Sequence, residues 1–281
     1  MVDRNFRFGV VAAPRAASTG NPDVDTWRRT ARRAEELGYS TLLMPDGLQL
    51  PSIAPSLAVA AEATTELHVG SFVMAGVLRP PRMTAYEANS LSVLTGGRFE
   101  LGMGTGNPMV LEQATEQLGY AKATGPQRLA KIDESIEHLR ELDGDQRTPV
   151  LMAAGGPKAR QLAAAKADIV TIAASPRAGD EEYGAAFAHL REVAGSRADE
   201  IELLMNVFAV GHELPPEAQG YLGSDAQDLI DRGALAVLHG STREMADELQ
   251  RRRDAFGVSY ISVNGAFLEQ MAPVVELLQG R

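Results

Sequence analysis

Cysteine is absent from this chain of 281 residues. Its absence excludes disulfides, thiolate nucleophiles, iron–sulfur clusters and zinc sites with cysteine ligands, and it makes a cytoplasmic setting the expected one. Long hydrophobic runs are also lacking, so no membrane span is expected. The first apolar segment, residues 8–13, lacks the basic flank and cleavage pattern of a signal peptide, and we interpret it as part of a strand.

Positive charge is scarce. The chain has 27 lysines and arginines against 37 aspartates and glutamates, which gives a net charge of −10. No run of basic residues and no alternation of basic and aromatic residues offsets this excess. A phosphate backbone would be repelled, so we do not expect nucleic acid as a partner.

Motifs for metal binding and for serine hydrolysis are missing as well. The five histidines form no short-range ligand pair, and neither a Walker A motif nor a G-x-S-x-G motif occurs. We therefore predict no metal site. His239 is the histidine of most interest, because it follows the seventh expected strand.

Short apolar segments alternate with helical patterns along the whole chain. Hydrophobic residues make up 44% of the sequence and charged residues 23%, which is ordinary for a folded globular protein. The short apolar segments are typical of buried parallel strands. The expected strands are 6–12, 41–45, 67–73, 98–103, 149–153, 168–172, 201–208 and 259–263. The expected helices are 23–37, 54–64, 82–94, 126–142, 157–166, 181–194, 225–232, 241–256 and 267–279.

This alternation predicts an α/β fold, a (β/α)8 TIM barrel that forms a single domain over residues 1–281, with an insertion around residues 211–240. An open, doubly wound sheet is the alternative. That fold would usually divide a chain of this length into two domains, and no shift in composition marks a boundary. In a barrel, active sites lie at the carboxyl ends of the strands.

The glycine-rich stretch from Arg98 to Asn107 is one such strand end. Its spacing, Gly-x-Gly-x-Gly, is not the dinucleotide-binding fingerprint. Bare backbone of this kind either makes a turn with positive φ or allows close approach of a ligand. Because it follows the fourth expected strand, at the active face of a barrel, we favour ligand contact.

A second glycine motif, Gly155-Gly156-Pro157, follows the fifth expected strand and opens a helix. Free N–H groups and the helix dipole make this an anion-binding geometry, although a plain Gly-Gly turn before Pro157 is the structural alternative. Arg177, after the sixth expected strand, is a candidate cation for the same anion.

Several motifs, in order, resemble the luciferase-like monooxygenase family, and in particular its branch that uses the deazaflavin coenzyme F420. The motifs that carry the resemblance are 43–46 (Leu-Met-Pro-Asp), 70–73 (Gly-Ser-Phe-Val), 94–106 around the glycine-rich strand, 154–157 (Ala-Gly-Gly-Pro) and 167–168 (Ala-Asp). The resemblance covers residues 6–174 and 240–265. The signature at 94–106 is the most specific of these motifs.

This resemblance implies a flavin-like ring in the barrel mouth. Asp46 would lie near the polar edge of the ring, and a bulge with a cis peptide between Phe72 and Val73 would back its face. The remaining implied residues would hold the side chain and phosphate of the coenzyme. The expected coenzyme-binding residues are Asp46, Phe72, Val73, Thr105, Gly106, Asn107, Ala154, Gly155, Gly156 and Arg177. Arg79, Arg82, Lys158 and Arg160 either form a basic rim for the anionic tail or are solvated helix residues.

Two positions depart from the family pattern. Gly47 stands where relatives commonly have the histidine of the sugar-phosphate dehydrogenases, and Asn107 stands where an acidic residue is frequent. Both changes remove proton donors. No catalytic residue is therefore assigned, and Tyr86, Asn107 and His239 are candidates by position alone.

Three functions follow from the resemblance. The first is an F420-dependent oxidoreductase that transfers a hydride between the deazaflavin and a small organic substrate. The second is an FMN-dependent monooxygenase on the same fold, and the third is a non-catalytic coenzyme-binding protein. Relatives commonly form homodimers, and Tyr86, Ala88, Leu91 and Val93 either provide such an interface or pack on the barrel.

Overall fold

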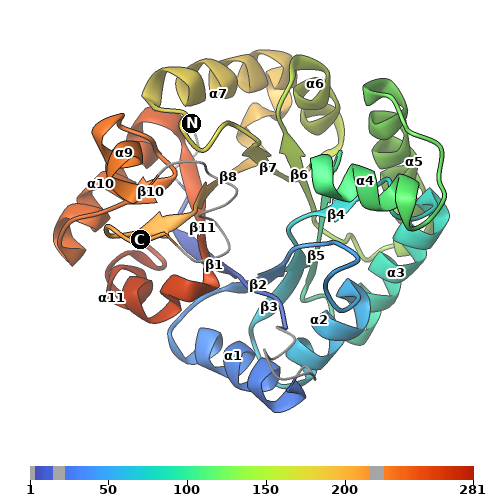
Figure 1. Cartoon of the computed structure of the whole chain (residues 1–281), viewed down its shortest axis with the longest axis horizontal. Coiled ribbons are helices and arrows are strands. Elements are labelled where there is room, and N and C mark those ends of the chain that lie inside the picture. Colours follow the sequence, from blue (N-terminus) through green and yellow to red (C-terminus); the bar gives the residue numbers. More distant parts are fainter. Residues whose placement is uncertain (1–3, 15–22, 215–224) are drawn as a thin grey trace.

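Parallel strands close into a barrel in the computed structural model of this chain, which describes residues 4–14, 23–214 and 225–281. Each barrel strand pairs with the next along the chain and the first pairs with the last, so the sheet closes on itself (Figure 1). The barrel strands are β1 (Arg7–Val11), β2 (Thr41–Met44), β3 (His68–Ser71), β5 (Phe99–Gly104), β6 (Val150–Ala154), β7 (Ile169–Ile172), β8 (Glu202–Val207) and β11 (Val258–Asn264). The predicted TIM barrel is confirmed.

Helices surround the barrel on its outside (Figure 1). They are α1 (Val24–Glu36), α2 (Ile53–Glu62), α3 (Pro81–Leu94), α4 (Pro108–Glu116), α5 (Gly125–Asp143), α6 (Pro157–Lys166), α7 (Asp180–Ala194), α9 (Ala226–Asp231), α10 (Thr242–Phe256) and α11 (Leu268–Leu278). The 3-10 turns η1 (Gly195–Asp199) and η2 (Gly265–Phe267) follow α7 and β11. None of the described helices is long and apolar enough to cross a membrane.

Local sequence signals account for the ends of these helices. Ser241 and Glu244 form a capping box at the start of α10. Gly257 ends the same helix in the left-handed conformation, with φ of 74°. Thr124 and Gln127 form a second capping box at the start of α5.

The segment around 211–240 is partly ordered into secondary structure. The short strand β9 (Ala209–Val210) follows β8 and pairs in parallel with β10 (Val237–Leu238), and α9 confirms the helix expected at 225–232. Pro215 and Pro216, which belong to the predicted insertion, lie outside the described residues.

Helix α4 is present although no helix was expected between the fourth strand and residue 126. Asn107 caps it by accepting a hydrogen bond from the Val110 N–H at 3.0 Å, and Pro108 occupies its first turn. The Asn-Pro pair is therefore the signal in the sequence for this helix. Because α4 begins directly after β5, its N-terminus lies at the barrel mouth.

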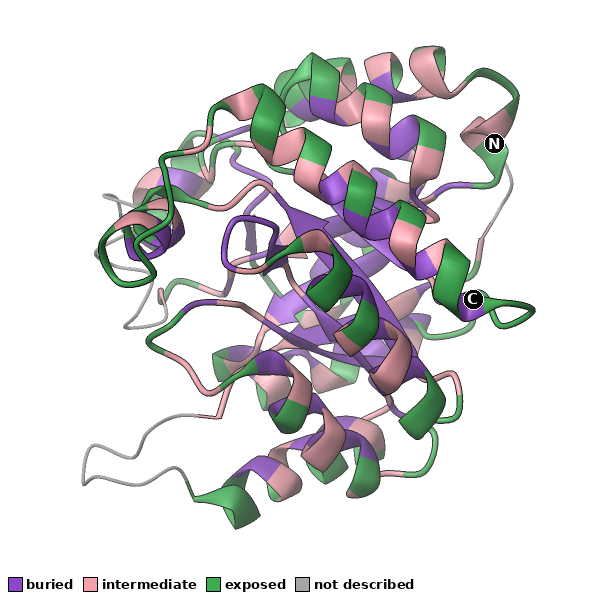
Figure 2. Ribbon diagram, turned by 90° about the vertical axis from the view of Figure 1, so that its right-hand side faces the viewer, coloured by how far each residue is buried: buried purple, intermediate pink, exposed green. Residues whose placement is uncertain are grey.

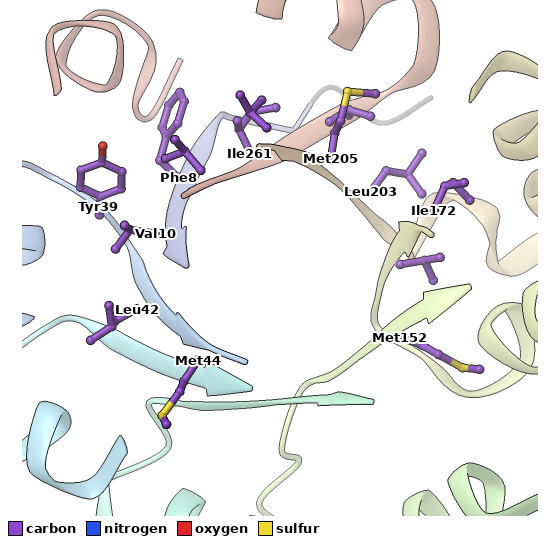
Figure 3. Packing of buried hydrophobic residues seen from close by; sticks show 14 of the residues in the cluster. Phe8, Val10, Tyr39, Leu42, Met44, Met152, Ile172, Leu203, Met205 and Ile261 are labelled. Atoms are coloured by element: carbon purple, nitrogen blue, oxygen red, sulfur yellow. The ribbon is translucent and has the colours of Figure 1, made fainter. Parts of the chain in front are cut away.

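The hydrophobic core has two layers in and around the barrel, and a third small cluster consists of Ala75, Val77, Leu78, Val110 and Ala114. Inside the barrel, a small cluster consists of Leu43, Leu151, Ile169, Leu204 and Tyr260. The larger cluster fills the space between the strands and the helices, and Figure 3 shows some of its side chains on the outer side of the strands. Figure 2 shows the buried strands enclosed by helices whose outer faces are exposed.

Paired charges fill the amino-terminal end of the barrel. Arg7 lies 2.6 Å from carboxylate oxygens of both Glu100 and Glu202, and its guanidinium lies 3.6 Å from the ring centroid of Tyr260. Burial by itself lowers the pKa of Arg7, but the negative groups around it outweigh burial and raise this pKa. This end of the barrel stabilises the fold, and a ligand site is expected at the other end.

Candidate functional site

A cavity of about 900 Å³ opens at the carboxyl ends of the strands. Its walls come from the ends of β2, β5, β6 and β7, the β3–β4 segment, where β4 is Met74–Ala75, and the first turns of α4, α5 and α6. The lining residues are Pro45, Asp46, Phe72, Val73, Ala75, Gly104, Thr105, Gly106, Asn107, Val110, Gly125, Pro126, Arg128, Leu129, Ala153, Gly155, Gly156, Pro157, Lys158, Ala159 and Ala173.

Eight of the ten expected coenzyme-binding residues line this cavity. The other two, Ala154 and Arg177, do not. Ala154 is fully buried and its side chain belongs to the cluster between the barrel and the helices, because strand alternation turns it outward. Arg177 lies in the exposed loop after β7.

Asp46 is held by an ion pair at the end of β2. Arg79 donates hydrogen bonds of 2.6 and 3.2 Å to its two carboxylate oxygens, and the Ala75 N–H donates a third at 3.1 Å. The Asp46 and Arg79 side chains are 6% and 16% exposed. Burial lowers the pKa of Arg79, but Asp46 and then Glu87 outweigh burial and raise it. Arg79 therefore neutralises Asp46 and does not belong to a basic rim.

An apolar wall follows β3. The peptide bond between Phe72 and Val73 is cis, as the family resemblance predicts. Phe72 and Val73 contact the cluster inside the barrel and also line the cavity, next to Ala75. A flat apolar ring is the ligand shape that fits against such a wall.

The three glycines of the glycine-rich stretch serve three different purposes. A Cβ at Gly102 would stand 1.8 Å from the Ser71 carbonyl oxygen, so only glycine allows β3 and β5 to lie this close. A Cβ at Gly104 would stand 2.5 Å from Cγ2 of Val73. Gly106 alone has a positive φ, 82°. Gly104 and Gly106 line the cavity, whereas Gly102 does not.

The N-terminus of α6 offers free donors to the cavity. Its N-cap is Gly156, which provides no side-chain hydrogen bond, and Pro157 has no N–H. The donors of the first turn are therefore the backbone N–H groups of Lys158 and Ala159, and both residues line the cavity. In contrast, the Asn107 side chain caps α4, and at the start of α5 the Gln127 side chain accepts a hydrogen bond from the Thr124 N–H at 2.8 Å. This helix end fits an anion such as a phosphate.

Basic residues near α6 have different roles. Lys158 is exposed and lines the cavity. Arg160 donates hydrogen bonds to the Gly155 carbonyl oxygen and, at 3.2 Å, to His189, so it holds the glycine turn in place. Arg82 is exposed on α3 and lies outside the lining. Of the four residues considered for a basic rim, Lys158 alone lines the cavity.

Two of the three candidates for proton transfer lie away from the cavity. Tyr86 is 61% exposed on α3. His239 lines a second cavity, of about 440 Å³, together with Asp180 and residues of α10. Asn107 does line the main cavity, but its side-chain oxygen caps α4. Among the described residues, no group of three potential ligands could hold a metal ion.

Some residues of the site were not expected from the sequence. Arg128, in the first turn of α5, lines the cavity. Gln113 of α4 donates to Gln49 at 2.6 Å and accepts from the Leu48 N–H at 3.0 Å, which ties α4 to the loop after β2. The Gln49 side chain occupies the space beside Gly47, only 2.5 Å from where a Cβ would stand. No motif marks these residues, because their role depends on how two distant loops meet.

The cavity therefore suits a ring compound with an anionic side chain. The apolar wall at Phe72 and Val73 fits the ring, and the uncapped start of α6 fits an anion. The lining residues that can carry a charge are Asp46, Arg128 and Lys158, and Asp46 is already paired.

Comparison with known proteins matches nearly the whole chain to one family. A model of the luciferase-like monooxygenase family matches residues 6–279. An F420-dependent glucose-6-phosphate dehydrogenase from Microbacterium testaceum is 27% identical over 212 residues, which cover 64% of this chain and 62% of that relative. The match thus spans about three fifths of the length of this curated relative.

Solved structures share the fold over nearly the whole chain. A coenzyme F420 dependent tetrahydromethanopterin reductase from Methanopyrus kandleri superposes with a TM-score of 0.73 at 17% identity, covering 98% of this chain and 99% of that one. A riboflavin lyase with modified FMN and riboflavin superposes with a TM-score of 0.74 at 15% identity, covering 98% and 92%. At these identities the likeness concerns the fold alone.

Proposed function

Because this chain belongs to the luciferase-like monooxygenase family, we propose that it is an oxidoreductase that binds coenzyme F420 and transfers a hydride between the deazaflavin and a small organic substrate. The observation that carries the proposal is the presence of an apolar wall and an uncapped helix N-terminus in one cavity. The F420-dependent relatives support the choice of coenzyme.

The candidate coenzyme-binding residues have distinct roles in this proposal. Phe72 and Val73 back the ring, and Asp46 lies toward its polar edge. The residues from Thr105 to Asn107 contact the side chain, and the turn at Gly155–Gly156 holds the phosphate together with the first N–H groups of α6. Ala154 supports this turn from behind, and Arg177 adds positive charge near the same phosphate.

When the coenzyme is bound, it supplies or accepts the hydride. The chain binds the coenzyme and the substrate, orients them and excludes water from the cavity. Asp46 is committed to Arg79 and to the Ala75 N–H, so its carboxylate is fixed rather than available to move a proton. Asn107 lines the cavity and its side-chain oxygen caps α4, so in this proposal its amide NH2 group donates to a substrate oxygen. These side chains can therefore orient a substrate rather than transfer a proton to it.

FMN is the alternative coenzyme, because it also combines a ring with a phosphate and because the riboflavin lyase with modified FMN has the same fold. The corresponding activity would be an FMN-dependent monooxygenase. A non-catalytic coenzyme-binding protein is the third candidate, favoured by the paired Asp46 and by the glycine at position 47.

Titration of the purified protein with F420 and with FMN, followed by ligand fluorescence, distinguishes these candidates. We expect F420 to bind at least about tenfold more tightly than FMN, a difference of about 1.4 kcal/mol. Tight binding of FMN with no binding of F420 would contradict the proposal. Stoichiometric F420 binding without hydride transfer to any of a broad panel of acceptors would favour the non-catalytic protein.

We also propose a homodimer that uses the exposed apolar face of α3. Met83, Tyr86, Val93 and Leu94 are 46 to 78% exposed and recur at helical spacing along one face. Ala88 and Leu91, which were candidates for the same interface, are buried against the barrel. The proposed interface therefore consists of Met83, Tyr86, Val93 and Leu94, which point outward from α3.

A further inference from the structure

Thr171, Asn206 and Ser262 form a polar row inside the barrel, above the inner hydrophobic cluster. Leu204 of β8 and Tyr260 of β11 belong to that cluster, and side chains two residues apart on a strand share a face. Asn206 and Ser262 therefore point into the barrel, one step nearer its mouth. The two residues are paired in the register, and the Ser262 hydroxyl donates a hydrogen bond to Oδ1 of Asn206 at 2.8 Å.

Thr171 connects the polar row to the main cavity. It lies on β7, two residues after Ile169 of the inner cluster, so it also points into the barrel. Thr171 is the register partner of Leu204, and the same register places Ala173 beside Asn206. Ala173 lines the main cavity. The polar row therefore continues the wall of that cavity from β7 to β11.

Two donors of the polar row have no partner in the described part of the chain. Neither the Thr171 hydroxyl nor the Asn206 NH2 group hydrogen-bonds another described residue, although Thr171 is only 5% exposed and Asn206 is half-buried. The Ser259 hydroxyl, on the outer side of β11, is an unpartnered atom that solvent cannot reach, whereas Thr171 and Asn206 contribute no such atom. A ligand that enters the cavity can therefore reach them and supply the missing partner.

The polar row lies across the barrel from the apolar wall at Phe72 and Val73. Going around the closed sheet from β3 to β8 takes four steps by way of β2, β1 and β11, and four by way of β5, β6 and β7. Figure 1 shows these two strands on opposite sides of the barrel. Phe72 and Val73 contact the inner cluster, which forms a common floor for both walls. If the coenzyme ring lies against Phe72 and Val73, the substrate has the polar row on its other side.

The polar row is uncharged. Among the inward-facing side chains of β7, β8 and β11, all of which the structure describes, the charged one is Glu202. It lies at the amino-terminal end of the barrel, where Arg7 donates to it at 2.6 Å. An amide NH2 group and a hydroxyl can pair with a neutral oxygen atom, whereas a buried phosphate or carboxylate needs a cation beside it. The polar row therefore suits an uncharged part of a ligand.

We propose that the Asn206 NH2 group and the Thr171 hydroxyl bind a carbonyl or hydroxyl oxygen of the substrate. This inference rests on the proposed function, and it names the class of substrate: an uncharged carbonyl compound or the corresponding alcohol, rather than a sugar phosphate. Ser262 is a positioning residue, because its hydrogen bond to Oδ1 fixes which end of the Asn206 amide is free to donate.

The test measures the binding of two probes that have the same shape and differ in one oxygen atom. Cyclohexanone carries a carbonyl group, and methylenecyclohexane has a CH2 group in place of the oxygen. Their dissociation constants are measured by NMR titration of the wild type, Thr171→Val and Asn206→Leu, with and without F420. In each variant we expect the preference for cyclohexanone over methylenecyclohexane to fall about fivefold, as loss of one neutral hydrogen bond does.

Further variants separate binding from folding. Asn206→Leu leaves the Ser262 hydroxyl without its partner, so the double variant Asn206→Leu/Ser262→Ala, which removes both groups, should be at least as stable and should show the same loss of preference. Ser262→Ala keeps the Asn206 NH2 group but frees its orientation, so we expect a smaller loss. Thr171→Val should leave the thermal midpoint unchanged or higher, because the hydroxyl that it removes has no partner among the described residues.

The carbonyl carbon resonance of bound, isotope-labelled cyclohexanone is the readout that a structural role would not move. A hydrogen bond to the oxygen draws electron density from this carbon. We therefore expect the resonance to shift to higher frequency on binding to the wild type, and to shift less on binding to Thr171→Val and Asn206→Leu.

The outcomes that overturn the proposal are distinct from failure of the proposed function. An unchanged preference in both variants overturns it, as does the absence of cyclohexanone binding to the F420-loaded wild type. Displacement of cyclohexanone from the F420-loaded wild type by an equal or lower concentration of cyclohexanecarboxylate overturns the uncharged class. If the wild type binds no F420 and the preference still falls in the variants, the proposed function fails and the neutral site stands.

Discussion

The carboxylate of Asp46 is fixed by three hydrogen bonds from two positions of the chain, Ala75 and Arg79. Asp46→Ala would leave the Arg79 guanidinium nearly buried, with Glu87 at 3.7 Å as its remaining carboxylate partner. We expect the free energy of unfolding, measured with urea, to fall by about 3 kcal/mol. The double variant Asp46→Ala/Arg79→Ala should recover part of this loss. An Asp46→Ala variant as stable as the wild type would show that the pair contributes nothing.

A substitution at Gly156 can test ligand binding without disturbing the fold. Its φ is −89°, and a Cβ built there meets no atom within 4 Å. Gly156→Ala should therefore leave the thermal midpoint nearly unchanged. The added methyl group would face the cavity beside the first N–H groups of α6, so we expect the dissociation constant for F420 to rise about tenfold. Unchanged affinity in a folded variant would argue against a phosphate at this turn.

At the scale of elements, the end of α1 is tied to the start of β3 by Glu35. Its Oε1 accepts hydrogen bonds of 2.7 to 2.9 Å from the backbone N–H groups of Thr65, Glu66 and Leu67. Burial raises the pKa of Glu35, but these three bonds outweigh burial and lower this pKa below its ordinary value.

The lowered pKa of Glu35 determines how the stability of the protein should change with pH. The bonds contribute fully above the ordinary glutamate pKa of about 4.3, and their contribution is lost as the pH falls through the lower value of the folded state. We expect Glu35→Gln to lower the free energy of unfolding by about 1 kcal/mol at pH 7 and by less at pH 3. A difference that stays constant with pH would contradict this assignment.

Elements with a repeating pattern could be predicted from the sequence. Each expected strand is present, because the alternation of apolar strands with helices repeats along the chain. Helix α4 was missed because it interrupts that alternation, although Asn107 and Pro108 mark its start. The need for glycine at 102 was attributed to a ligand, whereas it arises from the approach of the Ser71 carbonyl oxygen.

The part of the site that consists of motif residues could also be predicted from the sequence. Residues in motifs, such as Asp46 and Gly156, line the cavity as expected. Arg128 has no motif around it, and its place in the cavity wall becomes visible only once α5 is placed beside the cavity. Arg79 neutralises Asp46 because the fold brings the two side chains together, and the sequence alone does not reveal this pairing.

At the scale of the whole molecule, the exposed face of α3 predicts a dimer. Val93 is 60% exposed, and an aspartate there would place a charge in the proposed interface. We expect light scattering to give about twice the single-chain mass of 30.0 kDa for the wild type and a monomer for Val93→Asp. The control Arg243→Asp, on α10, should remain dimeric. A monomeric wild type would contradict the proposed dimer.

A crystal structure with F420 bound is the measurement that tests the central claim most directly. We predict that the deazaflavin ring lies against Phe72 and Val73, and that its phosphate lies about 3 Å from the backbone nitrogens of Lys158 and Ala159. A coenzyme bound outside this cavity, for example in the second cavity beside His239, would contradict the proposed site.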